Sequence, residues 1–303
     1  MCVNGFGTHI KSTGQTLIVQ KKHSVDEIPL KSIKNLIIIG GHTINSATII
    51  NLVKNGTYIS FFEPNGTPIG VIRPFGEKPD DALRKTQIGV PSHRFAKALA
   101  QASLKSRLIA IDKAQEQCHE RFYYEGELQI LHKSLEEMEY LIKLDEIRRL
   151  GRLASDMYYE IMSRNLPSDL GYRRRQQIHP TDPVNAMLSF GYSILFGNCC
   201  IPVIGYRLDP DIGMMYEGPG SFVRDLIEPF KAEMIDAEVF RYARTTLISS
   251  QFETGKDRCI LSDSVIQDLT DMFHRSIDNE KISEQVSNFW HAIKENEEIR
   301  VLY

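Results

Sequence analysis

Hydrophobic residues in the first quarter of the chain form short runs that end at turn residues. These runs are rich in β-branched and aromatic side chains, which is typical of β-strands. The dipeptide Asn65–Gly66 separates the last two runs and predicts a hairpin turn between them. We therefore predict a β-rich N-terminal domain over residues 1–75, with strands at Thr16–Val19, Leu36–Ile39, Thr57–Phe62 and Pro68–Ile72.

Helical spacing of apolar residues appears once in this domain and dominates the rest of the chain. Asn45–Gly56 begins with a capping residue and ends at a glycine, so it predicts one helix among the strands. Residues 76–94 mix prolines, glycines and charges and are expected to be a linker. The domain over 95–303 is predicted to be mostly helical, with helices at Phe95–Gln117, Gly126–Met138, Tyr140–Met162, Pro183–Gly197, Phe222–Ser250 and Ser264–Arg275. The expected fold class is α+β.

Composition narrows the possible functions. The 36 basic and 39 acidic residues give a net charge of −3, so any nucleic-acid surface must be a local patch. No apolar run approaches the roughly 20 residues that span a bilayer, and residues 1–15 do not resemble a secretory signal. A cytoplasmic protein with no membrane partner is expected. The five cysteines include no C-x-x-C pair, which argues against a disulfide framework or a zinc site, and Cys199 and Cys200 are expected to lie in the core.

Two segments of the helical domain carry candidate chemistry. Arg173, Arg174 and Arg175 form a compact basic cluster that is suited to phosphate oxygens or, alternatively, is a solvated loop. Further along, Asp225 and Glu228 stand one helical turn apart. This spacing suits oxygen ligation of Mg²⁺ or Mn²⁺, although two such carboxylates are more often solvated or paired with arginines.

Three motifs in order resemble a known family. They are Asp182–Asn185 with Leu188, Ser189, Gly191 and Tyr192; Leu208–Gly213; and Asp225–Phe230. Following a β domain, they resemble the CRISPR-associated integrase and endonuclease subunit of the spacer-acquisition complex. The resemblance implies a homodimer through the N-terminal domains, a small CRISPR adaptation partner protein, and binding of duplex or branched DNA from the spacer precursor and the CRISPR repeat. It also implies Mg²⁺- or Mn²⁺-dependent joining of DNA 3′ ends to the repeat, with a Glu, a His and an acidic residue as metal ligands.

The sequence departs from the family pattern at two of the three ligand positions. Alignment places Gly151 at the Glu position and Tyr216 at the His position, and keeps only Glu228 with Asp225 beside it. A tyrosine is a poor ligand at neutral pH because its pKa is near 10. The resemblance therefore implies a DNA-binding or scaffold subunit that is weakly active or inactive, in which Mg²⁺ or Mn²⁺ binding is doubtful. Arg152, beside Gly151, is a candidate for replacing part of the metal's charge toward a phosphate.

The alternative is an active metal-dependent endonuclease and integrase that takes its missing carboxylate from Glu217 or Glu146. Under either hypothesis, six arginines are the candidate DNA contacts: Arg148, Arg149, Arg152, Arg173, Arg174 and Arg175. A dimer is also expected because Leu36–Ile39 and Thr57–Phe62 look too apolar for a small domain to cover, which makes Ile38 and Phe61 candidate interface residues.

Overall fold

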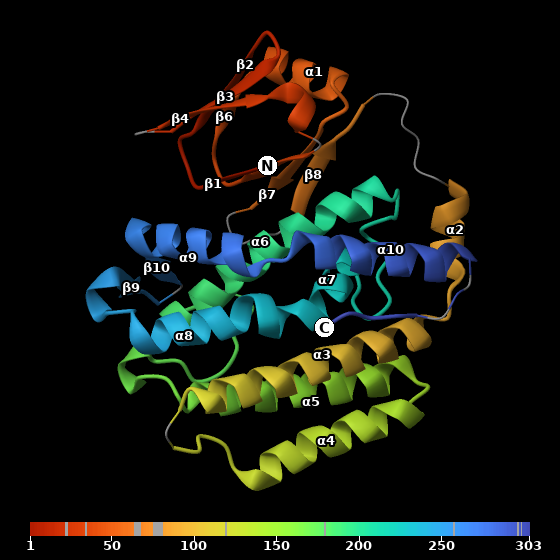
Figure 1. The fold of residues 1–303 in the computed structure, drawn as a ribbon, viewed down its shortest axis with the longest axis vertical. Coiled ribbons are helices and arrows are strands. Elements are labelled where there is room, and N and C mark those ends of the chain that lie inside the picture. Colours follow the sequence, from red (N-terminus) through yellow and green to blue (C-terminus); the bar gives the residue numbers. More distant parts are fainter. Residues whose placement is uncertain are drawn as a thin grey trace. The chain divides into compact units, whose positions relative to one another are not determined.

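The computed structural model describes residues 1–21, 24–33, 35–63, 68–74, 81–118, 120–178, 180–256, 258–295, 297 and 299–303. It divides the chain into two compact units, Met1–Pro79 and Asp80–Tyr303, which are described separately (Figure 1). The α+β class predicted from the sequence is confirmed: strands dominate the first unit and helices the second.

The N-terminal unit contains two four-stranded sheets. One has the order β1-β5-β7-β8, with β1 (Cys2–Asn4), β5 (Asn35–Ile39) and β7 (Tyr58–Phe62) parallel and β8 (Pro68–Ile72) antiparallel to β7. The other has the order β4-β3-β2-β6, formed by β4 (Val25–Pro29), β3 (Thr16–Gln20), β2 (His9–Thr13) and β6 (Thr43–Ile44). Helix α1 (Ser46–Lys54) begins at Asn45, whose side chain accepts a hydrogen bond from the Thr48 amide.

The apolar strands of this unit supply its own core. Leu36, Ile38 and Ile59 are buried together, and Phe61 packs against the same cluster. The inference that these strands need a second copy to cover them is therefore wrong for Ile38: a protomer covers this side chain by packing its own two sheets and α1. The predicted turn at Asn65–Gly66 lies outside the described residues, although the antiparallel pairing of β7 with β8 is present.

The second unit is built around long helices. Helices α3 (Ser92–Glu116), α4 (Glu125–Tyr140) and α5 (Leu144–Ser163) pack side by side (Figure 1). Helix α6 (Pro183–Gly205) packs against α7 (Ser221–Ile227), α8 (Ala237–Thr245), α9 (Asp263–Ser276) and α10 (Asn279–Glu295), and against the strand β10 (Cys259–Leu261), which pairs with β9 (Phe252–Thr254). Short 3-10 turns lie at Leu30–Ser32 in the first unit and at Ser168–Leu170 and Ser249–Gln251 in the second.

Part of the expected linker is a helix. Residues 81–94 contain α2 (Asp81–Gly89) and the first residues of α3, and both belong to the second unit. Gln87 is buried, and its amide donates to the backbone oxygens of Asp209 and Ile212. These tertiary bonds hold α2 in a segment whose prolines, glycines and charges predict no helix.

The segment Phe222–Ser250 is not one helix, and the interruption determines where Glu228 lies. Helix α7 ends at Ile227, and Glu228–Phe230 forms a 3-10 turn because Pro229 has no amide hydrogen to continue the helix. A π-helical turn at Ala232–Asp236 follows before α8 begins. Glu228 therefore lies at a junction between helix types, a position at which functional sites are frequently found.

Helix α6 is long and apolar enough to cross a membrane by length and composition, with 56% of its most apolar window buried inside the protein. The sequence prediction that no apolar run approaches about 20 residues did not anticipate this helix, because Asn185, Ser189 and Ser193 lie among its apolar residues. Its contacts with α7, α8, α9 and α10 are those of a core helix. Cys199 and Cys200 lie on it and are buried, as predicted.

Candidate metal centre and DNA surface

Glu228 is buried and surrounded by protein cations. Its Oε1 accepts a hydrogen bond from Arg107 Nη2 at 2.8 Å, and its Oε2 accepts from Lys231 Nζ at 2.5 Å. The Tyr216 hydroxyl donates to the same Oε2 at 3.1 Å. Both carboxylate oxygens are thus engaged by side chains of this chain. The Glu228 and Arg107 side chains are only 8% and 5% exposed, so the ion pair is shielded from solvent.

These neighbours control the charge of Glu228. Burial by itself raises the pKa of this carboxyl, but Lys231 and Arg107 outweigh burial and lower the pKa to about 2. Burial alone would lower the pKa of Arg107, yet Glu228 raises it. The pKa of Tyr216 is also raised, first by burial and then by the Glu228 charge, so the phenol stays protonated and donates its hydrogen. The result is an ion-pair cluster in which Arg107 and Lys231 face Glu228, and both cations also act on the charge of the buried Asp236.

Asp225 holds a tight turn. Its Oδ2 accepts from the backbone amides of Met214 and Met215, and its Oδ1 accepts from that of Tyr216 at 2.9 Å. Gly213 begins the turn, where an added Cβ would lie 2.6 Å from the Tyr216 carbonyl oxygen, so only glycine fits. Burial raises the pKa of Asp225 to about 7 against the lowering effect of the three amides. This carboxylate is used to fold the turn that presents Tyr216.

Gly151 is a half-buried residue of α5. It is one turn from Ile147 and one from Ala154, and both are buried. Arg148, on the neighbouring position, donates to the Met215 carbonyl oxygen at 2.6 Å and pairs with Glu217, so this part of α5 contacts the turn that carries Tyr216. A Cβ placed on Gly151 would meet nothing within 4 Å. The helix therefore leaves open space at the position where the family pattern has a carboxylate.

The two alternative carboxylates lie on the surface. The Glu217 side chain is 83% exposed and pairs with Arg148, and Glu146 pairs with Lys143 at 3.5 Å. Arg152, the candidate for replacing part of the metal's charge, is exposed as well. The cations that contact Glu228 are instead Arg107 and Lys231. Sequence reasoning missed these two. Lys231 follows Glu228 by three residues, and Arg107 interrupts the apolar stripe of α3 between Leu104 and Leu108, which is the signal that was available.

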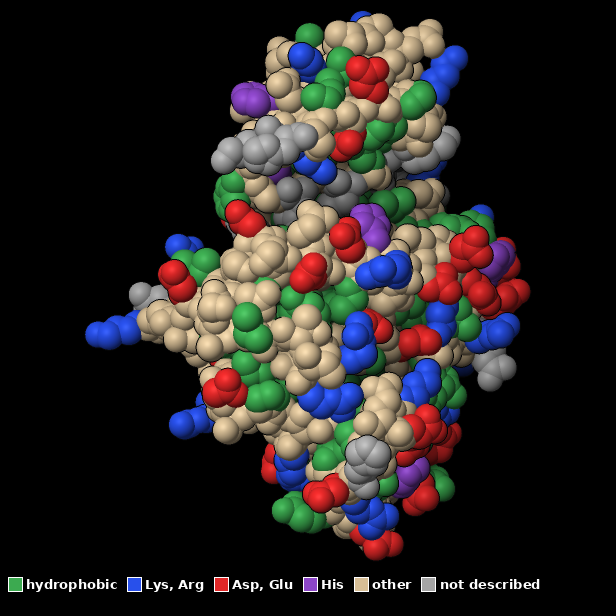
Figure 2. Space-filling view, turned by 60° about the vertical axis from the view of Figure 1, so that its left-hand side comes forward, with side chains coloured by type: hydrophobic (Ala, Val, Ile, Leu, Met, Phe, Trp, Pro, Cys, Tyr) green, Lys and Arg blue, Asp and Glu red, His purple; other side chains and the backbone are tan. Residues whose placement is uncertain are grey.

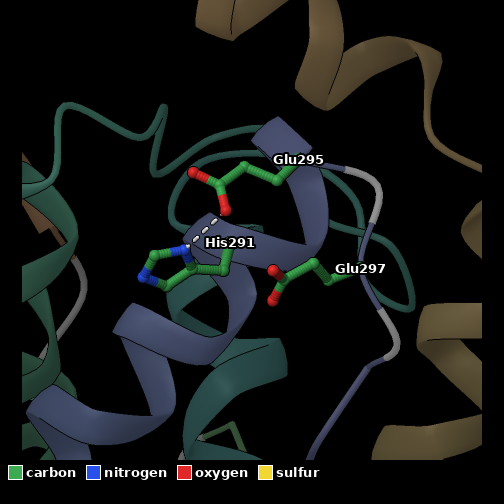
Figure 3. A group of neighbouring side chains, drawn as sticks. All are labelled: His291, Glu295 and Glu297. Atoms are coloured by element: carbon green, nitrogen blue, oxygen red, sulfur yellow. Dashed lines mark hydrogen bonds and ion pairs between the residues drawn. The ribbon is translucent and has the colours of Figure 1, made fainter.

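The residues around Glu228 do not fit a metal ion. Mg²⁺ and Mn²⁺ need free oxygen ligands and no competing cation, but the oxygens of Glu228 and Asp225 already accept hydrogen bonds from protein donors. Among the described residues, the one group of three metal-ligand side chains whose donor atoms come together is His291, Glu295 and Glu297, at the end of α10 (Figure 3). It is a partly exposed cluster in which His291 pairs with Glu295, and it includes none of the expected ligands.

The six candidate DNA arginines divide into two kinds. Arg148 and Arg175 bond to groups of the protein itself. Arg148 donates to the Met215 carbonyl oxygen. Arg175 donates from Nη1 to Asn185 and from Nη2 to Ser189, and its guanidinium lies over the Tyr192 ring. The other four, Arg149, Arg152, Arg173 and Arg174, are exposed. Figure 2 shows basic and acidic side chains intermixed over one face of the molecule, in keeping with the net charge of −3.

Comparison with known proteins identifies the family. The family model described as CRISPR associated protein Cas1 matches residues 1–275. The chain belongs to the Cas1 family. A Methanospirillum hungatei relative named "Putative CRISPR-associated endonuclease Cas1 2" is 39% identical over 285 residues, which cover 94% of each chain. "CRISPR-associated endonuclease Cas1" of Korarchaeum cryptofilum is 27% identical over 84% of this chain and 82% of its own.

Solved structures agree on the Cas1 fold. A Cas1 protein from Thermotoga maritima matches with a TM-score of 0.80 at 16% identity, covering 100% of this chain and 99% of its own. A chain of a Cas6-RT-Cas1–Cas2 complex matches with a TM-score of 0.82 at 17% identity, covering 98% of this chain and 35% of its own. These structures show the fold, and the family model with the Methanospirillum hungatei relative confirms the family resemblance seen in the sequence.

Proposed function

We propose that this Cas1-family protein is a DNA-binding subunit of CRISPR spacer acquisition whose metal centre has been replaced by an internal ion-pair cluster. The observation that carries the proposal is the saturation of the Glu228 carboxylate by Arg107, Lys231 and Tyr216. A metal ion could bind Glu228 only by displacing the buried Arg107 and the partly buried Lys231. It would find a glycine at position 151 and a phenol at position 216 in place of two ligands.

The partners follow from the same family membership. A Cas1–Cas2 assembly among the structural neighbours supports a small partner protein, and the four exposed arginines supply charge for DNA. Such a protein would act on the genome in the cytoplasm. We also propose a homodimer through the N-terminal unit, with its interface on the edge strand β8 instead of at Ile38. Ile69 and Val71 of β8 are 63% and 48% exposed.

A test of activity separates this proposal from an active enzyme. Wild-type protein is incubated with branched DNA and with a duplex plus a CRISPR repeat, in Mg²⁺, Mn²⁺ or EDTA, and cleavage and strand joining are measured. We expect the metal-containing reactions to match the EDTA control. The double variant Gly151→Glu, Tyr216→His adds two ligands at the vacant positions and is expected to gain at most partial activity, since Arg107 and Lys231 remain.

The contrary outcome is also specific. Robust metal-dependent joining by the wild type, abolished by Glu228→Gln in a variant that still unfolds cooperatively, would overturn the proposal. Glu217 and Glu146 would then be changed next, because one of them would have to supply the missing carboxylate.

The dimer is tested separately by light scattering. Ile69→Asp with Val71→Asp is expected to give folded monomers, because both side chains are exposed. Ile38→Asp instead buries a charge in the core and is expected to unfold the N-terminal unit. A wild type that is monomeric at micromolar concentration, or a double variant that remains dimeric, would contradict an interface on β8.

A further inference from the structure

Helix α10 ends in a group of three side chains that offers one imidazole and two carboxylates. His291 and Glu295 lie one turn apart on the helix, and Glu297 comes from the chain beyond it (Figure 3). One ligand atom from each residue lies within 4.8 Å of the other two, and both carboxylates point toward the His291 ring. His291 is half-buried and both glutamates are exposed, so an ion from solvent can reach the group.

Glu297 distinguishes this group from an ordinary pair on a helix surface. His291 Nδ1 and Glu295 Oε2 lie 3.1 Å apart, and pairs at this spacing are common on helices. Glu297 adds a second negative charge beside that pair. Within the part of the chain that the structure describes, neither glutamate forms an ion pair with a lysine or an arginine. Lys294, next to Glu295 in the sequence, lies instead over the Trp290 ring at 4.2 Å from its centre.

The end of α10 favours a cation independently of the side chains. The last carbonyl groups of a helix have no amide partner within it, and the helix dipole places a partial negative charge at this end. A carboxylate is unfavourable in such a position. Glu295 is the last residue of α10 and Glu297 follows two residues later, so two negative charges add to that of the helix end. A positive ion would relieve all three.

The types of donor atom select among ions. An imidazole nitrogen suits Zn²⁺ and related transition metals, whereas Mg²⁺ and Ca²⁺ take oxygen ligands. Zn²⁺ binds histidine nitrogen and glutamate oxygen, and it is often held by three protein ligands with water in the fourth position. With bonds of about 2.0–2.2 Å, two donor atoms on a tetrahedral ion lie roughly 3.4 Å apart. The present separations of up to 4.8 Å are close enough for exposed glutamate side chains to reach this geometry by rotation.

The chain turns back along α10 after this group. In Figure 1 it runs from the end of α10 to the C-terminus between α10 and α3. The Leu302 amide donates to the side chain of Gln285, a buried residue of α10, at 2.8 Å. Lys105 of α3 lies over the ring of Tyr303. The far end of the C-terminal segment is therefore attached to the helical unit, and Glu297 lies near its start.

We propose that His291, Glu295 and Glu297 bind one Zn²⁺ ion, which fastens the start of the C-terminal segment to α10. The ion joins two ligands on the helix to one beyond it, as the Leu302 hydrogen bond joins the other end of the segment to the same helix. The absence of C-x-x-C pairs argues only against thiolate sites and does not bear on this one. The site contains none of the candidate DNA contacts, so it does not depend on the proposed function.

Isothermal titration calorimetry of Zn²⁺ into metal-free, full-length protein tests the site. We expect saturation at one ion per chain, with weaker binding of Mn²⁺ and no detectable binding of Mg²⁺. Glu297→Gln is expected to weaken Zn²⁺ binding by about tenfold or more, and His291→Ala to abolish it. Two matched controls should keep the wild-type affinity: His274→Ala changes an exposed histidine of α9, and Glu284→Gln changes an exposed carboxylate of α10 outside the group.

Amide hydrogen exchange measured by mass spectrometry tests the fastening. Saturating Zn²⁺ should slow exchange of the peptide that contains residues 299–303 in the wild type and in Glu284→Gln, but not in His291→Ala. The absence of saturable Zn²⁺ binding, or binding that His291→Ala and Glu297→Gln leave unchanged, would overturn the site. Zn²⁺ binding that does not change the exchange of this peptide would overturn the fastening role.

Discussion

Replacing Glu228 by glutamine removes one charge from the ion-pair cluster and keeps the shape of the side chain. Lowering the pKa from the ordinary 4.5 to about 2 corresponds to about 3 kcal/mol of stabilisation of the ionised form in the folded state. Breaking a buried ion pair by removing one partner costs about 3–5 kcal/mol, because the remaining charges stay buried without compensation. Glu228→Gln is therefore expected to lower the free energy of unfolding at pH 7 by about 3–5 kcal/mol.

Urea unfolding followed by the fluorescence of Trp290 measures this loss. Trp290 is the single tryptophan of the sequence and lies on α10, in the same unit as Glu228. The folded-state pKa of Glu228 lies below its unfolded value, so its contribution is present above about pH 4.5 and is lost as pH falls toward 2. The difference between wild type and variant should shrink over the same interval.

Glu233→Gln is the control for this measurement. Glu233 pairs with Lys281 near the same π-helical turn, but its side chain is 43% exposed, so its loss should cost less than about 1 kcal/mol. A Glu228→Gln variant that loses no more stability than this control at pH 7 would show that the ion pairs of Glu228 do not stabilise the fold. So would a loss that stays constant between pH 4.5 and 2.

Two other substitutions test neighbouring parts of the account. Arg175→Lys is expected to weaken DNA binding, because lysine cannot reproduce the paired hydrogen bonds of the guanidinium to Asn185 and Ser189. Arg174→Lys keeps its charge on the surface and should bind DNA within about twofold of wild type. Equal affinities of the two variants in anisotropy assays would contradict the distinction between a positioning Arg175 and an exposed Arg174. Gly191→Ala places a Cβ 2.5 Å from Ile235 Cγ2 and 2.7 Å from Phe273 Cζ. This overpacking is expected to lower the free energy of unfolding in urea by about 1–3 kcal/mol. An unchanged urea midpoint would show that α6 and α9 can separate at no cost.

The sequence predicts where most of the helices lie better than it predicts where a helix is interrupted. Periodicity locates α3, α4 and α9 to within a few residues because each has one continuous apolar face. It misses α10, whose charged surface hides a buried stripe that includes Ile282, Val286 and Phe289. It also extends one helix through Pro229, where a local pattern cannot show that the chain continues as a π-helical turn.

In the candidate site, too, the sequence predicts the order of the motifs but not which side chains contact one another. The order of motifs along the chain places Tyr216 and Glu228 together, and the structure joins them through a hydrogen bond. The decisive partner, Arg107, is 121 residues away from Glu228, and no local pattern links the two. Arg175 looks like its two neighbours in the sequence, yet it alone points into α6, because direction depends on the fold of the segment and not on residue type.

Mn²⁺ binding distinguishes an ion-pair cluster at Glu228 from a working metal site. Mn²⁺ is titrated into the full-length protein carrying His291→Ala, which removes the surface cluster at the end of α10, and the electron paramagnetic resonance signal of the free aqueous ion is recorded. If Arg107 and Lys231 have taken the place of the metal, the signal should match that of buffer at every concentration. Loss of one equivalent of free Mn²⁺ per chain, restored by Glu228→Gln, would show a working metal site at Glu228 and contradict the account.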